Sequence, residues 1–196
     1  MITEAEIQTV DKEVYRETRR AVEALGMFIV PIRPLSIEDL LEEDKKRVKR
    51  RLNDAWVHSS RSMRTLVPPE MEVFIDPNVV RIKRSNKSIN VQKQMIEDAE
   101  ASFRLRLPEA VRRFVIMRMA DPSTLSQIED SYIDKKLGVL LFSDFFARTD
   151  VLTDGSRFAE VGRLNHNNDR LIDGWNGDDG RGVFAVPVGV LPWLSS

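Results

Sequence analysis

The side chains of this chain that could take part in catalysis are few and far apart. Its 196 residues include no cysteine and only two histidines, His58 and His166. Without cysteine the chain can form no disulfide, thiolate nucleophile or cysteine-bound zinc site. His58 lies near the end of a predicted helix, but a Ser–His–acid triad needs partners that adjacency in sequence does not supply. His166 lies in an asparagine-rich predicted turn, without the second histidine or spaced acids of a metal nuclease.

Oxygen ligands are concentrated at one further place, around a predicted glycine-rich turn. The members are Asp173, Asn176, Asp178 and Asp179. A calcium-binding EF-hand loop needs acids at alternating positions and a distal glutamate, and this stretch does not match that pattern. The chain also has no dinucleotide-binding, phosphate-loop or zinc-protease motif. We therefore expect no catalytic residue, no metal, no cofactor and no enzymatic activity.

The densest cluster of charge is basic and lies on the second predicted helix. It consists of Lys45, Lys46, Arg47, Lys49, Arg50 and Arg51, and Arg81, Lys83 and Arg84 follow it. On a helix these charges flank an apolar stripe through Val48 and Leu52, so they could neutralise phosphates. No aromatic residue is interleaved for stacking on single-stranded bases. The segment could instead bind an acidic protein surface, which we favour because the acidic parts of the chain would compete with DNA.

The near-neutral charge of the whole chain, −1, hides a strong segregation. Residues 1–44 carry a net charge of −6, residues 45–118 of +10 and residues 119–196 of −5. Such blocks indicate an anionic partner or charge-complementary neighbours in an assembly. No apolar run approaches the roughly 20 residues that cross a bilayer, and the acidic N-terminus does not resemble a signal peptide. We therefore expect synthesis in the cytoplasm and no membrane contact.

Helical periodicity dominates the first two thirds of the sequence. A capping box at Thr3 and Glu6 opens a first predicted helix, which ends at Gly26. An extended connector follows, and Ser36 then starts a second helix that ends before Pro68. Further helices are predicted over residues 89–106, 108–120 and 122–137.

Strands are predicted in the middle and in the last third of the chain. A hairpin is expected over residues 71–84, in which Val73 and Ile75 face Val80 and Ile82. Turn-forming residues separate three later strands, at 158–164, 170–175 and 183–190. The sequence thus predicts an α+β fold in two parts. These are a helical bundle with the hairpin over residues 1–138 and a small antiparallel β meander over residues 139–196.

Two sets of apolar residues have predicted roles. The first set should be buried in one helical core: Ile37, Leu41, Val48, Leu52, Trp56, Phe103, Val111, Val115 and Met119. The second set belongs to the C-terminal tail, which has more apolar surface than a short meander can bury. We therefore expect Phe184 and Trp193 to meet another chain.

The order of the central segments resembles the head-to-tail adaptor family (tail tubular protein A) of short-tailed bacteriophages. The stretches that carry the resemblance are Ala21–Gly26 leading to Pro31 and Pro34, the helix with Leu52-Asn53 and Trp56, Leu66–Pro69 leading to Ile75–Ile82, and Leu107–Phe114. Together they span residues 21–137. The family usually has more strand before the segment that matches Leu107–Phe114, and the tail from Val139 has no counterpart that we can assign.

The resemblance implies a structural virion protein that performs no covalent chemistry. Such adaptors form a homo-oligomeric ring that joins the portal protein to the tail nozzle protein and surrounds the DNA exit channel. Two alternatives remain open from the residues themselves. One is a nucleic-acid-binding protein that uses the basic helix 45–64. The other is a hydrolase or nuclease without a recognisable motif, for which the residues to replace are His58, His166, Asp144 and Glu160.

Overall fold

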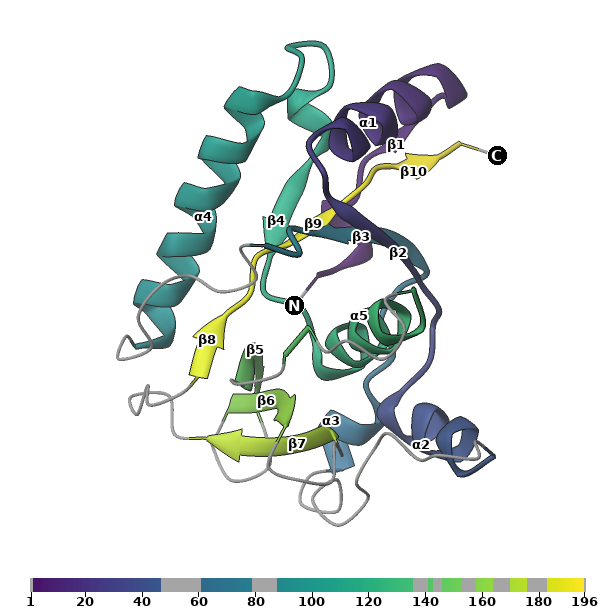
Figure 1. The fold of residues 1–196 in the computed structure, drawn as a ribbon, viewed down its shortest axis with the longest axis vertical. Coiled ribbons are helices and arrows are strands. Elements are labelled where there is room, and N and C mark those ends of the chain that lie inside the picture. The colour runs from purple at the N-terminus through teal and green to yellow at the C-terminus, as the bar shows by residue number, and fades with distance from the viewer. Residues whose placement is uncertain are drawn as a thin grey trace.

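The fold combines helices with antiparallel sheets, as the α+β prediction required (Figure 1). We analysed a computed structural model, which describes residues 2–46, 61–78, 88–135, 141–142, 146–152, 158–163, 170–175 and 183–195. Within these residues the strands form two sheets of four strands and one of two strands. None of the helices in these ranges combines the length and apolar composition that crossing a membrane requires.

The central sheet is built from both ends of the chain. Its strands, in spatial order, are β2 (Phe28–Ile32), β3 (Met71–Ile75), β9 (Val188–Val190) and β4 (Ile116–Arg118). Each neighbouring pair is antiparallel, and β9 lies between β3 and β4 (Figure 1). The C-terminal part of the chain therefore crosses the boundary expected after residue 138, and one buried cluster joins Ile2 and Ile37 with Phe142 and Val190.

The second sheet contains the first two strands of the predicted meander, part of the third, and one further strand. Its strands are β5 (Phe146–Leu152), β6 (Phe158–Arg163), β7 (Arg170–Trp175) and β8 (Val183–Ala185). β5, β6 and β7 follow one another antiparallel, whereas β8 pairs in parallel with the free edge of β5. The single strand predicted over 183–190 is wrong, because it divides at Pro187 into β8 and β9, which belong to different sheets. Proline has no N–H for a strand ladder, which favours such a break.

The N-terminal segment is not one continuous helix. Thr3 and Glu6 form the predicted capping box, but it closes only a 3-10 turn, η1 (Glu4–Glu6), and strand β1 (Thr9–Val10) follows. Helix α1 (Lys12–Ala24) starts at Asp11, whose carboxylate accepts the N–H groups of residues 13 and 14 at 2.9 Å each. This second cap explains the difference, since it satisfies the free N–H groups of a new helix start. Gly26, with φ of 78°, ends α1 as predicted.

The other helix predictions have mixed outcomes. Helix α2 (Ile37–Lys45) starts at Ser36, and α4 (Ile89–Arg106) and α5 (Pro122–Lys135) lie where predicted. Residues 47–60 lie outside the described residues, and α3 (Arg61–Thr65) follows them. The helix predicted over 108–120 is wrong: a 3-10 turn, η3 (Arg112–Phe114), leads into β4. Pairing of β4 with β9 overrides the local helical spacing.

The predicted hairpin is also corrected by the central sheet. At Val73, strand β3 is paired on one edge with Val30 of β2 and on the other with Val190 of β9. Both edges are therefore taken, so the predicted pairing of Val73 with Val80 is wrong. Residues 79–84, the second arm of the hairpin, lie outside the described residues.

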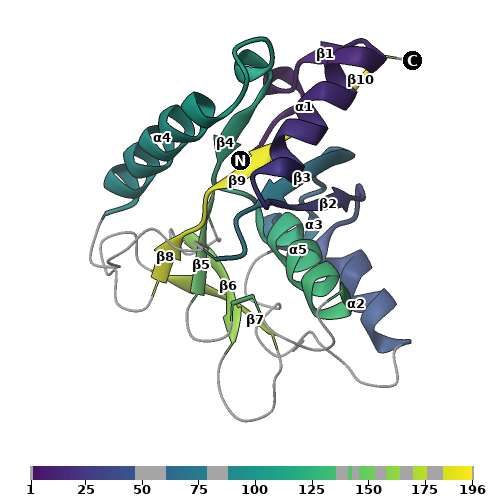
Figure 2. The ribbon, with the colours of Figure 1, turned by 45° about the horizontal axis from the view of Figure 1, so that its top comes forward.

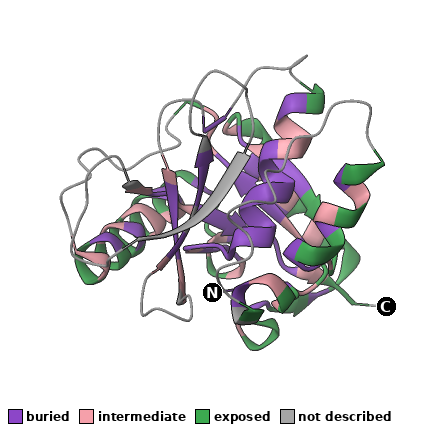
Figure 3. Ribbon diagram, turned by 90° about the horizontal axis from the view of Figure 1, so that it is seen from below, coloured by how far each residue is buried: buried purple, intermediate pink, exposed green. Residues whose placement is uncertain are grey.

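The described members of the predicted core are buried or half-buried, but they do not form a single helical cluster. Ile37, Phe103, Val111, Val115 and Met119 are buried, Leu41 is half-buried, and Val48, Leu52 and Trp56 lie outside the described residues. Ile37 belongs to one buried cluster and Phe103 to another. Helices cover a sheet here instead of packing only on one another, and the first half of α5 is buried on all sides (Figure 3).

Candidate functional site

Only two of the nine residues of the predicted basic surface are among the described residues. Lys45 and Lys46 are exposed at the end of α2, and the ammonium of Lys45 lies 2.5 Å from a carboxylate oxygen of Glu42. The remaining predicted phosphate contacts lie outside the described residues: Arg47, Lys49, Arg50, Arg51, Arg81, Lys83 and Arg84. The two histidines and Asp144 lie outside as well. Asp173, from the oxygen-rich cluster, is a β7 residue opposite Glu160 of β6, and its predicted companions are not described.

One concentration of charge surrounds β4, an edge strand of the central sheet. Helix α4 lies alongside β4 (Figure 2). Glu100 of α4 accepts the backbone N–H of Met117 at 2.6 Å, and the Arg104 guanidinium donates to the carbonyl of Val115 at 2.8 Å. These bonds occupy backbone groups that would otherwise be open to another strand. The charged side chains of α4 therefore seal this edge of the sheet.

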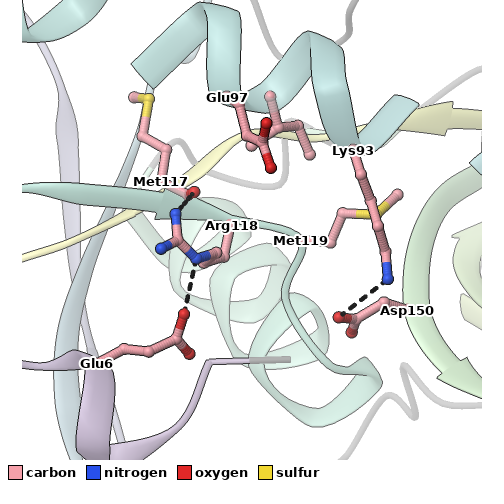
Figure 4. Close-up of a pocket in the computed structure, with 8 residues that line it drawn as sticks. Glu6, Lys93, Glu97, Met117, Arg118, Met119 and Asp150 are labelled. Atoms are coloured by element: carbon pink, nitrogen blue, oxygen red, sulfur yellow. Dashed lines mark hydrogen bonds and ion pairs between the residues drawn. The ribbon is translucent and has the colours of Figure 1, made fainter. Parts of the chain in front are cut away.

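A cavity of about 200 Å³ lies next to this edge (Figure 4). Its lining residues are Glu6, Lys93, Ile96, Glu97, Met117, Arg118, Met119 and Asp150. Arg118 joins three elements, because its guanidinium lies 2.8 Å from Glu6 of η1 and 2.9 Å from Glu100 of α4. Lys93 of α4 reaches Asp150 of β5 at 4.0 Å, which links α4 to the second four-stranded sheet.

The ionisation of these groups follows from their pairing. Burial alone would raise the pKa of Glu6, but the hydrogen bonds from Arg118 and Thr3 outweigh it, so the pKa is lowered. Burial would lower the pKa of Arg118, and Glu6 and Glu100 together raise it. Both groups are therefore held charged, as an ion-pair network that fixes η1 on β4. The cavity is also smaller than the roughly 300–1,000 Å³ of typical ligand pockets. Among the described residues, no three histidines or acids are placed to hold a metal ion.

A larger groove lies where the two ends of the chain meet, and we call it the terminal groove. It has a volume of about 440 Å³ and is lined by Tyr15, Pro31, Ile32, Arg33, Glu70, Met71, Glu72, Pro192, Trp193 and Leu194. Strand β10 (Trp193–Leu194) forms one wall and pairs in parallel with β1. Leu194 is 47% exposed. Most of the lining side chains are apolar, which distinguishes this groove from the charged cavity.

The predicted tail residues have separate places in the fold. Trp193 is half-buried in the terminal groove, and its indole N–H donates to the carbonyl of Glu70 at 2.9 Å. Phe184 is in β8, where it packs against the core from the second sheet. The two residues therefore lie in different sheets, and their contact with another chain stays a prediction. Only Trp193 lies on the groove.

The charged groups around the terminal groove are mostly paired. The Tyr15 hydroxyl donates to Glu72, whose carboxylate also lies 3.3 Å from the Arg19 guanidinium. Separately, the Arg33 guanidinium donates to both carboxylate oxygens of Glu43, at 2.8 and 2.6 Å. Burial and then the Glu72 hydrogen bond raise the pKa of Tyr15 to about 12. The carboxylate of Glu70 differs, since it makes no hydrogen bond or ion pair with the described part of the chain.

No protein-family model, curated protein or solved structure matches the chain. Sequence reasoning identified Trp193 but missed the opposite wall, which comes from Pro31, Ile32 and Met71 of the central sheet. The groove forms only when four distant segments meet. The adjacent apolar residues Trp193 and Leu194, which lie beyond the last predicted strand, are the sequence signal that could have indicated it.

Proposed function

We propose that this chain is a non-catalytic subunit that binds a protein partner through the terminal groove. The observation that carries the proposal is the groove itself: an apolar concavity beside a short strand whose Leu194 is 47% exposed. Exposed apolar surface rimmed by polar groups is typical of protein interaction sites. The rim favours a protein over a nucleic acid, because the carboxylate of Glu70, which pairs with no described residue, would repel phosphate.

The chemistry of the groove favours binding over catalysis. Its most perturbed titratable group is Tyr15, which stays protonated at neutral pH because its pKa is about 12. A general base works best when its pKa lies near the working pH. The Tyr15 hydroxyl also donates a hydrogen bond to Glu72, and this bond connects α1 to β3.

A head-to-tail adaptor is the particular form of subunit that the sequence resemblance suggests. Charge blocks of −6, +10 and −5 suit head-to-tail contacts in a ring. The partners would be neighbouring copies, the portal protein and the tail nozzle. One of the matching stretches departs from the expected structure, since Leu107–Phe114 leads into β4 and not into a helix. The hairpin expected in the stretch Ile75–Ile82 also departs, because β3 is paired on both edges. The resemblance therefore rests on Ala21–Gly26 and on the stretch with Trp56, which lies outside the described residues.

Co-sedimentation with a portal ring tests the proposal. Leu194→Arg adds a charge to an exposed groove residue, and we expect it to weaken binding at least tenfold. Val91→Arg is the matched control, because Val91 is similarly exposed, at 42%, but lies on α4. It should bind as the wild type does. A wild-type chain that stays monomeric and unbound beside the ring would contradict the adaptor proposal.

A further inference from the structure

Strand β10 uses one edge for β1, and no backbone of the described residues pairs with its other edge. The N–H of Trp193 donates to the carbonyl of Gln8, and the N–H of Ser195 donates to the carbonyl of Val10, each at 2.8 Å. Backbone groups alternate in direction along a strand, so the N–H and C=O of Leu194 point away from β1. Figure 1 shows β10 beside β1 and near β2 and β3, and residues of β10, β2 and β3 line the terminal groove.

The two edges of the central sheet are closed, which makes the edge of β10 distinctive. The β4 edge is sealed by Glu100 and Arg104. On β2, Pro31 has no N–H to offer, and the amide side chain of Gln127 binds both the N–H and the C=O of Arg33, at 2.9 and 3.0 Å. Edge strands closed in this way resist pairing with another chain. On the outer edge of β10, among the described residues, there is neither a proline nor a side chain bound to the backbone of Leu194.

We propose that an extended, basic segment of a partner protein binds the terminal groove as an added strand on β10. The inference rests on the proposed function and specifies the partner's chemistry. Main-chain hydrogen bonds to Leu194 would give affinity, and alternate side chains of the segment would enter the apolar groove. Ile32, Met71 and Trp193 provide that apolar surface.

The charge of the groove selects a basic segment. Glu70 carries the unpaired carboxylate of the rim, whereas Arg33 is neutralised by Glu43. The N-terminal segment that supplies β1 and α1, residues 1–24, adds six acidic and four basic side chains, a net charge of −2. A lysine or arginine that follows an apolar residue of the partner would therefore meet a complementary field.

The same charges disfavour a second copy in a symmetric arrangement. A two-fold interface brings a surface patch against its own image. Glu70 would then face its own image, and like charges placed together cost several kcal/mol. A partner segment of opposite charge avoids this repulsion.

Peptide binding to the full-length chain tests the inference. The probe is a labelled nine-residue peptide in which valine and lysine alternate, and the control peptide has glutamate in place of lysine. By fluorescence anisotropy we expect the lysine peptide to bind at least tenfold more tightly, with a difference that shrinks at high salt. Glu70→Gln should reduce this preference.

A pair of substitutions at Leu194 isolates the backbone contribution. Leu194→Ala removes the side chain alone, whereas Leu194→Pro also removes the outward N–H and keeps the bonds of Trp193 and Ser195 to β1. We expect the proline variant to bind the lysine peptide about fivefold more weakly than the alanine variant, the effect of one lost hydrogen bond. Unchanged hydrogen exchange of the β2–β3 amides would show that both variants are folded.

Three results would overturn the inference: equal binding of the two peptides, equal binding by the two Leu194 variants, or self-association of the chain that Leu194→Pro abolishes. The last result would identify a second copy as the occupant. If both peptides fail while the portal ring still binds through Leu194, strand addition is wrong and the proposed function stands. If the chain also does not bind the portal ring, both strand addition and the proposed function are wrong.

Discussion

Gly189 occupies the middle of β9, directly against the ring of Phe74. A Cβ atom added at Gly189 would lie 2.0 Å from the Cζ of Phe74, and Phe74 is fully buried. The ring also packs against Phe103, with centroids 5.2 Å apart, so it has little freedom to move. A side chain at position 189 therefore forces the β3–β9 pair apart.

Gly189→Ala should destabilise the protein by about 3 kcal/mol or more, as overpacking of a buried ring does. Gly26→Ala is the control, because nothing lies within 4 Å of its added Cβ and only the φ of 78° is strained. That strain costs about 1–2 kcal/mol. Urea denaturation of both variants measures the difference. Equal stability of the wild type and Gly189→Ala would refute the close approach of β9 to Phe74.

Asp121 is fully buried at the start of α5, where Thr124 donates to it through the backbone N–H at 2.9 Å and the hydroxyl at 2.6 Å. Burial raises the pKa of this carboxyl more than the Thr124 hydrogen bonds lower it. The folded state therefore binds more protons than the unfolded state between about pH 3.9 and the raised pKa. In this window the contribution of Asp121 to stability falls as the pH rises.

Asp121→Asn removes this titration and keeps a capping side chain. Its stability relative to the wild type should therefore increase as the pH rises from about 4. Asp39→Asn should behave oppositely, because hydrogen bonds from Ser36 lower the pKa of Asp39. Its deficit should be largest above about pH 4 and shrink as the pH falls. Urea midpoints across the pH range measure both, and parallel profiles for the two variants would contradict the assignment.

At the scale of elements, local patterns predicted the helices better than the strands. Residues 89–106 and 122–135 are helical as expected, because their apolar spacing and start signals agree. Residues 116–118 are not, because β9 arrives from a distant part of the sequence and pairs with them. The terminal groove was only partly predictable, because local patterns do not show which distant strands pair. Trp193 could be recognised from its own sequence surroundings, but the opposite wall of the groove depends on long-range pairing.

Sealing of the β4 edge by α4 gives a test at this scale. Glu100→Ala leaves the N–H of Met117 without its acceptor and breaks the ion pair with Arg118, so we expect a loss of about 2–3 kcal/mol. Glu97→Ala, on an exposed position of the same helix, should change stability by less than about 0.5 kcal/mol. Hydrogen exchange at Met117 should accelerate only in the first variant. Slow exchange there would show that α4 does not seal the edge.

At the scale of the molecule, the two ends of the chain complete one another's structure. β9 fills the space between β3 and β4, and β10 pairs with β1. The sequence predicted two parts that divide after residue 138, because composition and periodicity change there. Composition carries no information about which strands pair, so the crossing of β9 could not be predicted.

A fragment of residues 1–138 should not fold alone, because it lacks β9 between β3 and β4. We expect no cooperative urea transition by circular dichroism, and we expect recovery of the transition when residues 139–196 are co-expressed with it. This outcome follows from the shared core of the two parts. A cooperative transition of the isolated fragment would instead support the prediction that residues 1–138 form a separate domain.

Hydrogen exchange of the full chain, with and without a bound portal ring, locates the partner most directly. Our account predicts slower exchange at residues 70–72 and 192–195, which line the terminal groove, and unchanged exchange over the exposed face of α4. Leu194→Arg should abolish the protection together with the binding. The opposite result would be unchanged exchange at the groove and slower exchange around Lys45 and Lys46. It would contradict the central claim, because the partner would then bind the basic segment.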